Sequence, residues 1–349
     1  MAKSAEIPII DFASGRPEKE IAKELCEAAI TYGFIYIRSG ALDVGAVDRA
    51  FDISKHLFST TDVEEKKRCS IQKNNRGWTG IRSETLDPKT QKAGDFKEAF
   101  NFGEFVDGKA QQPVPNSIAD REGEISDIFD KFRALAVRIL YLLGVGLEVN
   151  PPDFFSSTHL KENGSSGTTL RFLHYPSVDS AEETTDAIRA GAHTDYGSVT
   201  LLFRLKGQAG LQILTPSSTW APVPVCPPTT ESDPSPPVLV NIGDMLSYWT
   251  NGLLKSTTHR VAVPTGDGDA AASDVLEGEG FKGGRYSIAL FCHPAGKTRL
   301  EPVPSEVVQR AGEKAGTVEA TGTGEGKVLT ADEHLATRLK ASYIDLYKK

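Results

Sequence analysis

The stretch GAHTDYGSVTLLF, residues 191–203, combines a strand-like pattern with two candidate metal ligands. Its second half is an apolar, β-rich run, and His193 and Asp195 stand just before that run. Side chains two positions apart on a strand point to the same face, so the imidazole and the carboxylate are predicted to aim at one point. A lone His-x-Asp is more often a hydrogen-bonded surface pair, so a metal site needs a third ligand elsewhere.

The segments that follow residue 165 share one pattern: short β-rich runs separated by Gly, Pro and Asp. They are TTLRFLHYP, SVTLLFRL, GLQILT, WAPVPV, PPVLVNIGDML, THRVAVP and RYSIALFCHP. Many short strands with turn signals between them predict an all-β sandwich or barrel. Helical patterns over 17–33, 43–58, 122–144 and 331–346 are predicted to flank it. We expect a mixed α/β region, 1–120, that packs on a core, 121–349, as one integrated unit.

Composition excludes several classes of protein. The net charge is −8 and no long basic stretch occurs, which argues against nucleic acid as a partner. The four cysteines are far apart and form no CxxC pair, so neither a disulfide framework nor a thiolate zinc site is expected. No apolar segment is long enough to span a bilayer and no signal peptide is evident, so a cytoplasmic location without membrane contact is predicted. The sequence carries no signal for oligomeric state.

Three segments are rich in Pro, Gly, Ser and Asp or otherwise polar: 226–237, 265–280 and 311–327. Such compositions are too polar to bury, and we predict mobile surface loops on the β domain. Passive surface loops and a lid over an active site are both compatible with this pattern.

A third ligand candidate is His259, at the start of the β run THRVAVP. Two histidines and one carboxylate from a β-sandwich would form a 2-His-1-carboxylate set, which suits non-haem Fe(II) and leaves coordination positions open. A structural zinc site would instead close its shell, usually with cysteine.

Arg285 and Ser287 in GGRYSIALF form a second pair on one strand face. Arginine offers a planar fork to a carboxylate, and serine adds a hydroxyl donor. An arginine flanked by apolar strand residues is costly to bury without an anion. A structural pair with Asp or Glu is the alternative, but the nearby His-x-Asp and His259 favour a bound dicarboxylate.

Together, HTDYGSVTLLF, SYWTNGLLKSTTHRV and RYSIALF resemble the isopenicillin N synthase-like family of Fe(II)/2-oxoglutarate-dependent oxygenases. IPIIDF, ITYGFIYI, NNRGWTGI and DFKEAFNFG resemble that family's N-terminal region, so the similarity runs from about residue 7 to 346. The resemblance implies a mainly β fold with a double-stranded β-helix (jelly-roll) core and flanking helices.

The resemblance also implies roles for individual residues. His193, Asp195 and His259 would bind Fe(II), and Arg285 and Ser287 would bind the distal carboxylate of the co-substrate 2-oxoglutarate. Tyr175 resembles a tyrosine that contacts the same carboxylate in plant members. Those members often carry Asn two residues earlier, where this chain has Leu173, so one co-substrate hydrogen bond is in doubt.

The implied activity is that of a dioxygenase in secondary metabolism. It would use O2 to hydroxylate, desaturate or cyclise a small organic metabolite while 2-oxoglutarate becomes succinate and CO2. Two alternatives stay open: an oxidase of the isopenicillin N synthase type that does not use 2-oxoglutarate, and a non-catalytic jelly-roll binding protein. The candidate substrate contacts are Arg171, Phe100, Asn101, Tyr196, Trp78 and Phe291.

Overall fold

Two β-sheets face each other in the computed structural model, which describes residues 4–38, 43–91, 93–177, 188–262, 284–315 and 328–342. The larger sheet has the strand order β1-β2-β12-β9-β14-β7-β4-β3, and the smaller has the order β11-β10-β13-β8. Their strands are β1 (Ile9–Asp11), β2 (Phe34–Arg38), β3 (Gly77–Thr79), β4 (Glu98–Phe102), β7 (Thr169–Tyr175), β8 (Ile188–His193), β9 (Val199–Arg204), β10 (Leu211–Leu214), β11 (Trp220–Pro222), β12 (Val238–Ile242), β13 (His259–Ala262) and β14 (Arg285–Cys292). This sandwich is the arrangement that the spacing of short β runs predicts.

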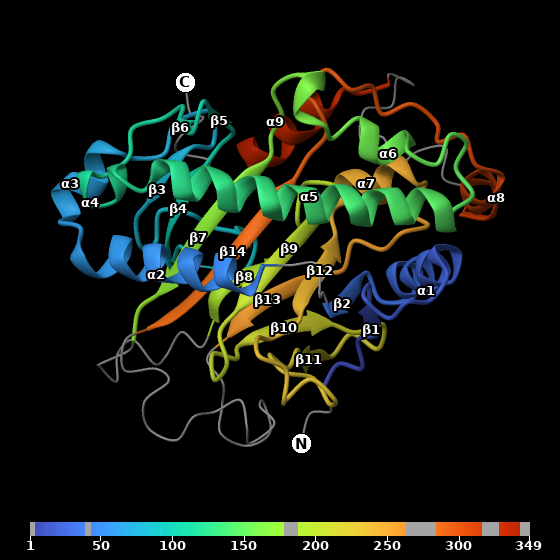
Figure 1. Cartoon of the computed structure of the whole chain (residues 1–349), viewed down its shortest axis with the longest axis horizontal. Helices are drawn as coiled ribbons and strands as arrows, with labels where there is room; N and C mark the ends of the chain where they lie inside the picture. The colour runs from blue at the N-terminus through green and yellow to red at the C-terminus, as the bar shows by residue number, and fades with distance from the viewer. Residues whose placement is uncertain are drawn as a thin grey trace.

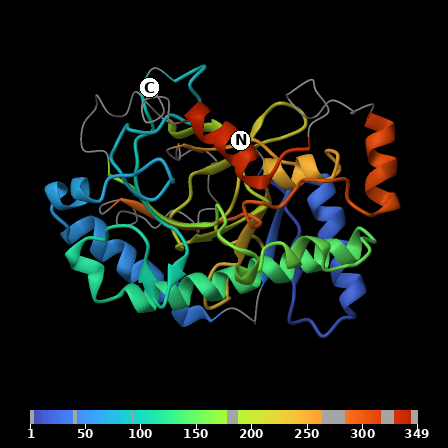
Figure 2. The same ribbon diagram turned by 90° about the horizontal axis from the view of Figure 1, so that it is seen from above.

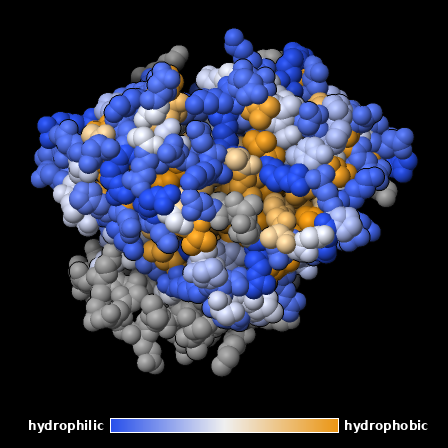
Figure 3. Space-filling view, in the orientation of Figure 1, coloured by the Kyte–Doolittle hydropathy of each residue, from blue (hydrophilic) through white to orange (hydrophobic). Residues whose placement is uncertain are grey.

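Helices cover the outer face of the larger sheet (Figures 1 and 2). They are α1 (Glu18–Thr31), α2 (Val44–Thr60) and α5 (Glu122–Gly146). The apolar stripe of α5 includes Ile125, Phe129 and Ile139, which are at most 1% exposed. Complete burial of such a side chain contributes about 1.5–3 kcal/mol. On the outward side of these helices hydrophilic residues dominate, and hydrophobic ones gather near the centre of the view (Figure 3).

The remaining elements lie around this sandwich (Figure 1). The short hairpin and helices are β5 (Phe105–Val106), β6 (Lys109–Ala110), α3 (Val63–Arg68), α4 (Asn116–Ala119), α6 (Phe154–Ser157), α7 (Asp244–Trp249), α8 (Glu306–Ala315) and α9 (Ala331–Ser342). In the view from above, α9 lies on the side of the strands opposite α5 (Figure 2). Among the helices in the described ranges, none combines the length and the apolar character of a membrane span.

The N-terminal region is built into the larger sheet. Strands β1 and β2 extend one edge of that sheet, and β3 and β4 extend the other. The predicted boundary after residue 120 falls between α4 and α5 and stays a prediction, but the strands on its two sides share one continuous ladder of hydrogen bonds.

Two of the three predicted loops need correction. In 226–237, Thr230 is fully buried and Arg38, the last residue of β2, forms a two-pronged contact with Asp233 at 2.7 Å, so this segment is held against the end of β2. The first residues of 311–327 belong to α8, which ends at Ala315. Polar composition misled the prediction because backbone and arginine partners satisfy these polar groups. Residues 265–280, the rest of 311–327, and Tyr343 in the last predicted helix lie outside the described residues.

Candidate metal and co-substrate site

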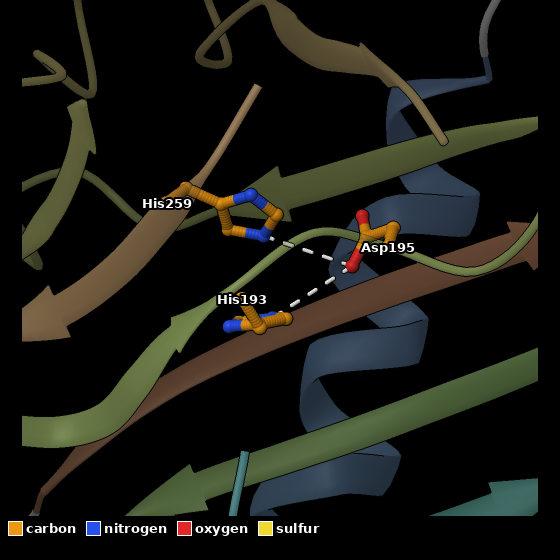
Figure 4. A group of neighbouring side chains, drawn as sticks. All are labelled: His193, Asp195 and His259. Carbon is orange, nitrogen blue, oxygen red and sulfur yellow. Dashed lines mark ion pairs between the residues drawn. The ribbon is translucent and has the colours of Figure 1, made fainter. Parts of the chain in front are cut away.

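The three predicted ligands come together between the two sheets. His193 is the last residue of β8 and His259 is the first of β13, and these strands pair so that the two histidines are directly opposite. Asp195 lies two residues beyond the end of β8, in the turn that leads to β9. The three side chains point toward one another in Figure 4, and their ligand atoms all lie within 4.8 Å of one another.

Hydrogen bonds orient each ligand atom. The Nδ1 atoms of His193 and His259 lie 2.8 and 3.1 Å from the backbone oxygens of Gly191 and Thr257, which leaves both Nε2 atoms for a metal. On the carboxylate of Asp195, Oδ2 accepts hydrogen bonds from Thr200 at 2.6 Å and Asn241 at 2.7 Å. Backbone carbonyls and hydroxyl or amide donors that hold metal ligands in this way fix the ligand orientation and tune the ligands.

The free Asp195 Oδ1 faces the histidines. It lies 3.7 Å from Nε2 of His193 and 3.6 Å from Nε2 of His259. Burial, followed by the charge of His259, lowers the pKa of His193 to about 4, so its imidazole is neutral at pH 7. Burial opposes the charge on Asp195, but the two histidines, Thr200 and Asn241 hold the pKa of this carboxyl below its usual value. Two imidazoles and one carboxylate are a donor set that fits Fe(II).

A cavity extends from these ligands over the inner face of the larger sheet. Strand β14 pairs with β7 so that Arg285 faces Tyr175, Ser287 faces Leu173, and Ala289 faces Arg171. These inward positions recur at every second residue, and all six residues line the cavity. The cavity is therefore ordered along the strands, from Arg285 at one end through Ala289 to Phe291 at the other.

Arg285 is 3% exposed, and no carboxylate of the described ranges pairs with it. Its Nε donates to the backbone oxygens of Gln208 and Ala209, and its Nη1 lies 3.5 Å from the Ser287 hydroxyl. Its guanidinium carbon lies 4.8 Å from the centre of the Tyr175 ring. Burial lowers the pKa of Arg285, because a buried guanidinium without a carboxylate partner is less stable in its charged form.

Leu173 also faces this end of the cavity, opposite Ser287. Its side chain cannot donate the hydrogen bond that an asparagine amide would provide. The departure from the plant pattern therefore leaves an apolar contact beside Arg285 and Ser287.

Four of the six predicted substrate residues line the cavity: Arg171, Asn101, Tyr196 and Phe291. Arg171 forms a two-pronged bond with Glu84, at 3.2 and 2.6 Å. The Tyr196 ring lies 5.2 Å from the guanidinium carbon of Arg338 on α9. That helix closes part of the cavity with Leu335 and Leu339.

The prediction for Phe100 and Trp78 is wrong. Asn101 of β4 faces the cavity, so its neighbour Phe100 points to the opposite side of the sheet, where it belongs to the core under the helices. The indole of Trp78 packs against the same core and donates to Glu98 at 3.0 Å. The alternation of side chains in β4 predicts two faces, one with Phe100 and one with Asn101. It does not predict which of these faces lines the cavity.

Three buried charged residues near the cavity were missed by sequence reasoning: Glu84, Asp95 and Lys97. Lys97 and Asp95 stand in DFKEAFNFG, whose mixture of charges reads as an exposed segment. Their only sequence signal is this position just before an apolar strand, and the partner Glu84 is more than ten residues away.

Two protein-family models match the chain. Residues 7–120 match the "non-haem dioxygenase in morphine synthesis N-terminal" family, and residues 167–294 match the "2OG-Fe(II) oxygenase superfamily". The second range contains His193, Asp195, His259, Arg285 and Ser287.

Curated relatives and solved structures match over nearly the whole chain. The UPF0676 protein C1494.01 of Schizosaccharomyces pombe is 33% identical over 93% of this chain and 92% of its own. The 2-oxoglutarate-dependent dioxygenase gloF of Glarea lozoyensis is 28% identical over 84% of this chain and 88% of its own. A crystal structure of a full-length Neurospora crassa protein in complex with alpha-KG and thymine is 28% identical, with a TM-score of 0.73, covering 98% of this chain and 99% of that one. These similarities confirm the jelly-roll fold class.

Proposed function

We propose which residues bind iron, co-substrate and substrate in this chain, which belongs to the 2-oxoglutarate–Fe(II) oxygenase superfamily. It is an oxidoreductase of the dioxygenase class, and the family uses Fe(II), 2-oxoglutarate and O2 on small-molecule substrates. In our proposal, His193, Asp195 and His259 hold the iron, and Arg285, Ser287 and Tyr175 hold the distal carboxylate of 2-oxoglutarate. The substrate lies against Arg171, Asn101, Tyr196 and Phe291.

The residues around the triad support this assignment by their chemistry. Iron held here would supply, with 2-oxoglutarate and O2, an oxidative decarboxylation that yields succinate, CO2 and an oxidant able to remove hydrogen from a substrate carbon. The chain's own contribution is placement: Thr200 and Asn241 hold the Asp195 carboxylate, and two backbone carbonyls hold the histidine rings. Most residues that line the cavity are buried, which limits the contact of the reacting groups with bulk water.

One observation carries the co-substrate assignment. Arg285 is buried beside a serine hydroxyl and a tyrosine ring, and no carboxylate of the described residues neutralises it. A buried guanidinium in this state favours an anionic ligand with a planar carboxylate. The cavity joins this end directly to the metal ligands, so one molecule could span both, with its keto acid end toward the metal.

The test is an anaerobic titration of the Fe(II)-loaded protein with 2-oxoglutarate, followed by the visible metal-to-ligand charge-transfer band. The matched control is 2-oxopentanoate, which has the same chain length and keto acid but no distal carboxylate. We expect the band with both compounds and saturation at about a hundredfold lower concentration with 2-oxoglutarate, because only it engages Arg285.

Two other outcomes would contradict the proposal. Iron binding without a band from either compound would mean that the keto acid does not reach the metal, and would favour an oxidase whose Arg285 holds the main substrate. Equal affinity for the two compounds would remove Arg285 and Ser287 from co-substrate binding.

A further inference from the structure

A cluster of four buried charged residues forms one wall of the cavity beside the metal ligands. Glu84, Asp95 and Lys97 come from the segment between β3 and β4, and Arg171 comes from β7; each is at most 7% exposed. Glu84, Lys97 and Arg171 line the cavity itself. Two carboxylates and two cations make the formal charge of this cluster zero.

The contacts run in a chain from the substrate side toward the metal. Arg171 uses two nitrogens on the two oxygens of Glu84, at 3.2 and 2.6 Å. Lys97 contacts Glu84 at 2.9 Å and also forms an ion pair with Asp95. Asp95 then accepts from the backbone N–H of Gly191 at 3.0 Å, and the carbonyl of that glycine holds the ring of His193.

This arrangement occupies the fork of Arg171. A two-pronged carboxylate contact is the geometry in which arginine would otherwise grip an acidic ligand. An acidic ligand that binds this fork would have to displace Glu84, and the buried carboxylate of Glu84 would then lose its two-pronged partner. Loss of a partner from a buried ion pair is strongly unfavourable, so the wall disfavours ligands with their own carboxylate.

Beside Arg171, the same wall offers a neutral acceptor. Asn101 is the direct strand neighbour of Arg171, lines the cavity and is 1% exposed. Its amide nitrogen donates to Asn75 at 3.0 and 3.1 Å, which fixes the amide orientation, and its Oδ1 is buried with no hydrogen-bond partner. A buried acceptor of this kind is costly unless a ligand N–H satisfies it.

We propose that Glu84 determines substrate specificity: by neutralising Arg171 it makes the cavity select uncharged molecules with amide or imide groups and reject carboxylates. This inference rests on the proposed function, because it assigns the substrate side of the same site. An amide or imide N–H is the donor that Asn101 lacks, and the ring of Phe291 offers an apolar surface for the rest of a small ligand.

The test uses matched pairs of probes that differ in charge: uracil and orotate, nicotinamide and nicotinate, and benzamide and benzoate. Binding to the Fe(II)- and 2-oxoglutarate-loaded enzyme is measured anaerobically by calorimetry. We expect the wild-type enzyme to bind at least one neutral probe and to bind its carboxylate partner about tenfold to a hundredfold more weakly. No binding of any neutral probe, or a preference for the carboxylates, would overturn the proposal.

The variant Glu84→Gln sharpens the test, because it leaves Arg171 without its carboxylate and gives the cluster a net positive charge. We expect the preference to shift toward the carboxylate probe by about tenfold to a hundredfold. The matched control is Glu98→Gln, which removes another buried glutamate, paired with Lys66 at 3.0 Å and outside the cavity lining. An unchanged preference in Glu84→Gln, or the same shift in Glu98→Gln, would contradict a specificity role for Glu84.

If Glu84→Gln does not fold, the double variant Glu84→Gln/Arg171→Gln replaces the ion pair by two neutral amides. We expect it to keep the preference for the neutral probe, and a reversed preference would count against the proposal. The charge-transfer band with 2-oxoglutarate is recorded first in each preparation. A normal band with no discrimination among probes refutes only this inference, whereas the absence of a band refutes the proposed function.

Discussion

Arg285 and Arg171 project from neighbouring strands of one sheet into one cavity, yet their charges are balanced differently. Both Nη atoms of Arg171 are bound by the carboxylate of Glu84, which comes from a distant part of the chain. Among the described residues, the guanidinium of Arg285 contacts backbone oxygens, the Ser287 hydroxyl and the Tyr175 side chain, and none of these carries a carboxylate. A buried charge needs a partner, and where the chain supplies none, a ligand of opposite charge can be expected. Arg171, which pairs with Glu84, is therefore part of the cavity wall, whereas Arg285 is available to bind an anionic ligand.

Both arginines line the same cavity as the three candidate metal ligands, and removal of one of these ligands gives the largest expected effect. We expect His193→Ala to lose iron binding and substrate-dependent succinate release down to background, because the remaining imidazole and carboxylate cannot form the three-ligand set. Iron content and succinate release measure this, with His56→Ala as the control for an exposed histidine. Normal turnover in His193→Ala would remove the triad from the reaction.

The second test separates the two arginines by their effect on folding. In Arg171→Met the Glu84 carboxylate stays buried with one cation fewer, and we expect a loss of about 3–5 kcal/mol in the free energy of unfolding. In Arg285→Met no buried carboxylate loses a partner, so the protein without ligands should lose far less. Urea unfolding of both variants measures the difference, and equal losses would erase the distinction between a paired and an unpaired arginine.

The third test separates them by ligand. We expect Arg285→Gln to weaken 2-oxoglutarate binding by about a hundredfold and to leave 2-oxopentanoate binding unchanged, because only the former has a distal carboxylate. Anaerobic titrations of the charge-transfer band measure both affinities. A parallel loss for the two compounds would show that the substitution damages the metal end of the cavity instead.

The smallest expected effect concerns the support of a metal ligand. Thr200→Val removes one of the two donors to Oδ2 of Asp195, and we expect iron affinity to fall by about tenfold. Competition with a metal chelator measures this affinity. Thr337→Val, which changes an exposed threonine on α9, is the control, and a matching loss there would mean that the Thr200 hydroxyl does not act through Asp195.

The alternation of side chains along a strand explains both the correct prediction for Arg285 and Ser287 and the incorrect one for Phe100. The pattern of RYSIALF was sufficient to put Arg285 and Ser287 on one strand face, because side chains on a strand alternate with a period of two. The same alternation in EAFNF could not say whether Phe100 or Asn101 faces the cavity, and the aromatic residue turned out to belong to the outer core. A short periodic pattern defines two faces without naming the one that is enclosed.

The features that could be predicted from the sequence are local: where strands and helices form, which side chains share a face, and the identity of the ligand atoms. The pairing of β13 with β8, which places His259 opposite His193, and the contact of Arg171 with Glu84 across 87 positions of the chain became evident in the folded structure alone. Pairings of this kind depend on the packing of whole sheets and on the need to neutralise each buried charge. Neither can be predicted from the residues that neighbour a strand or a charged side chain in the sequence.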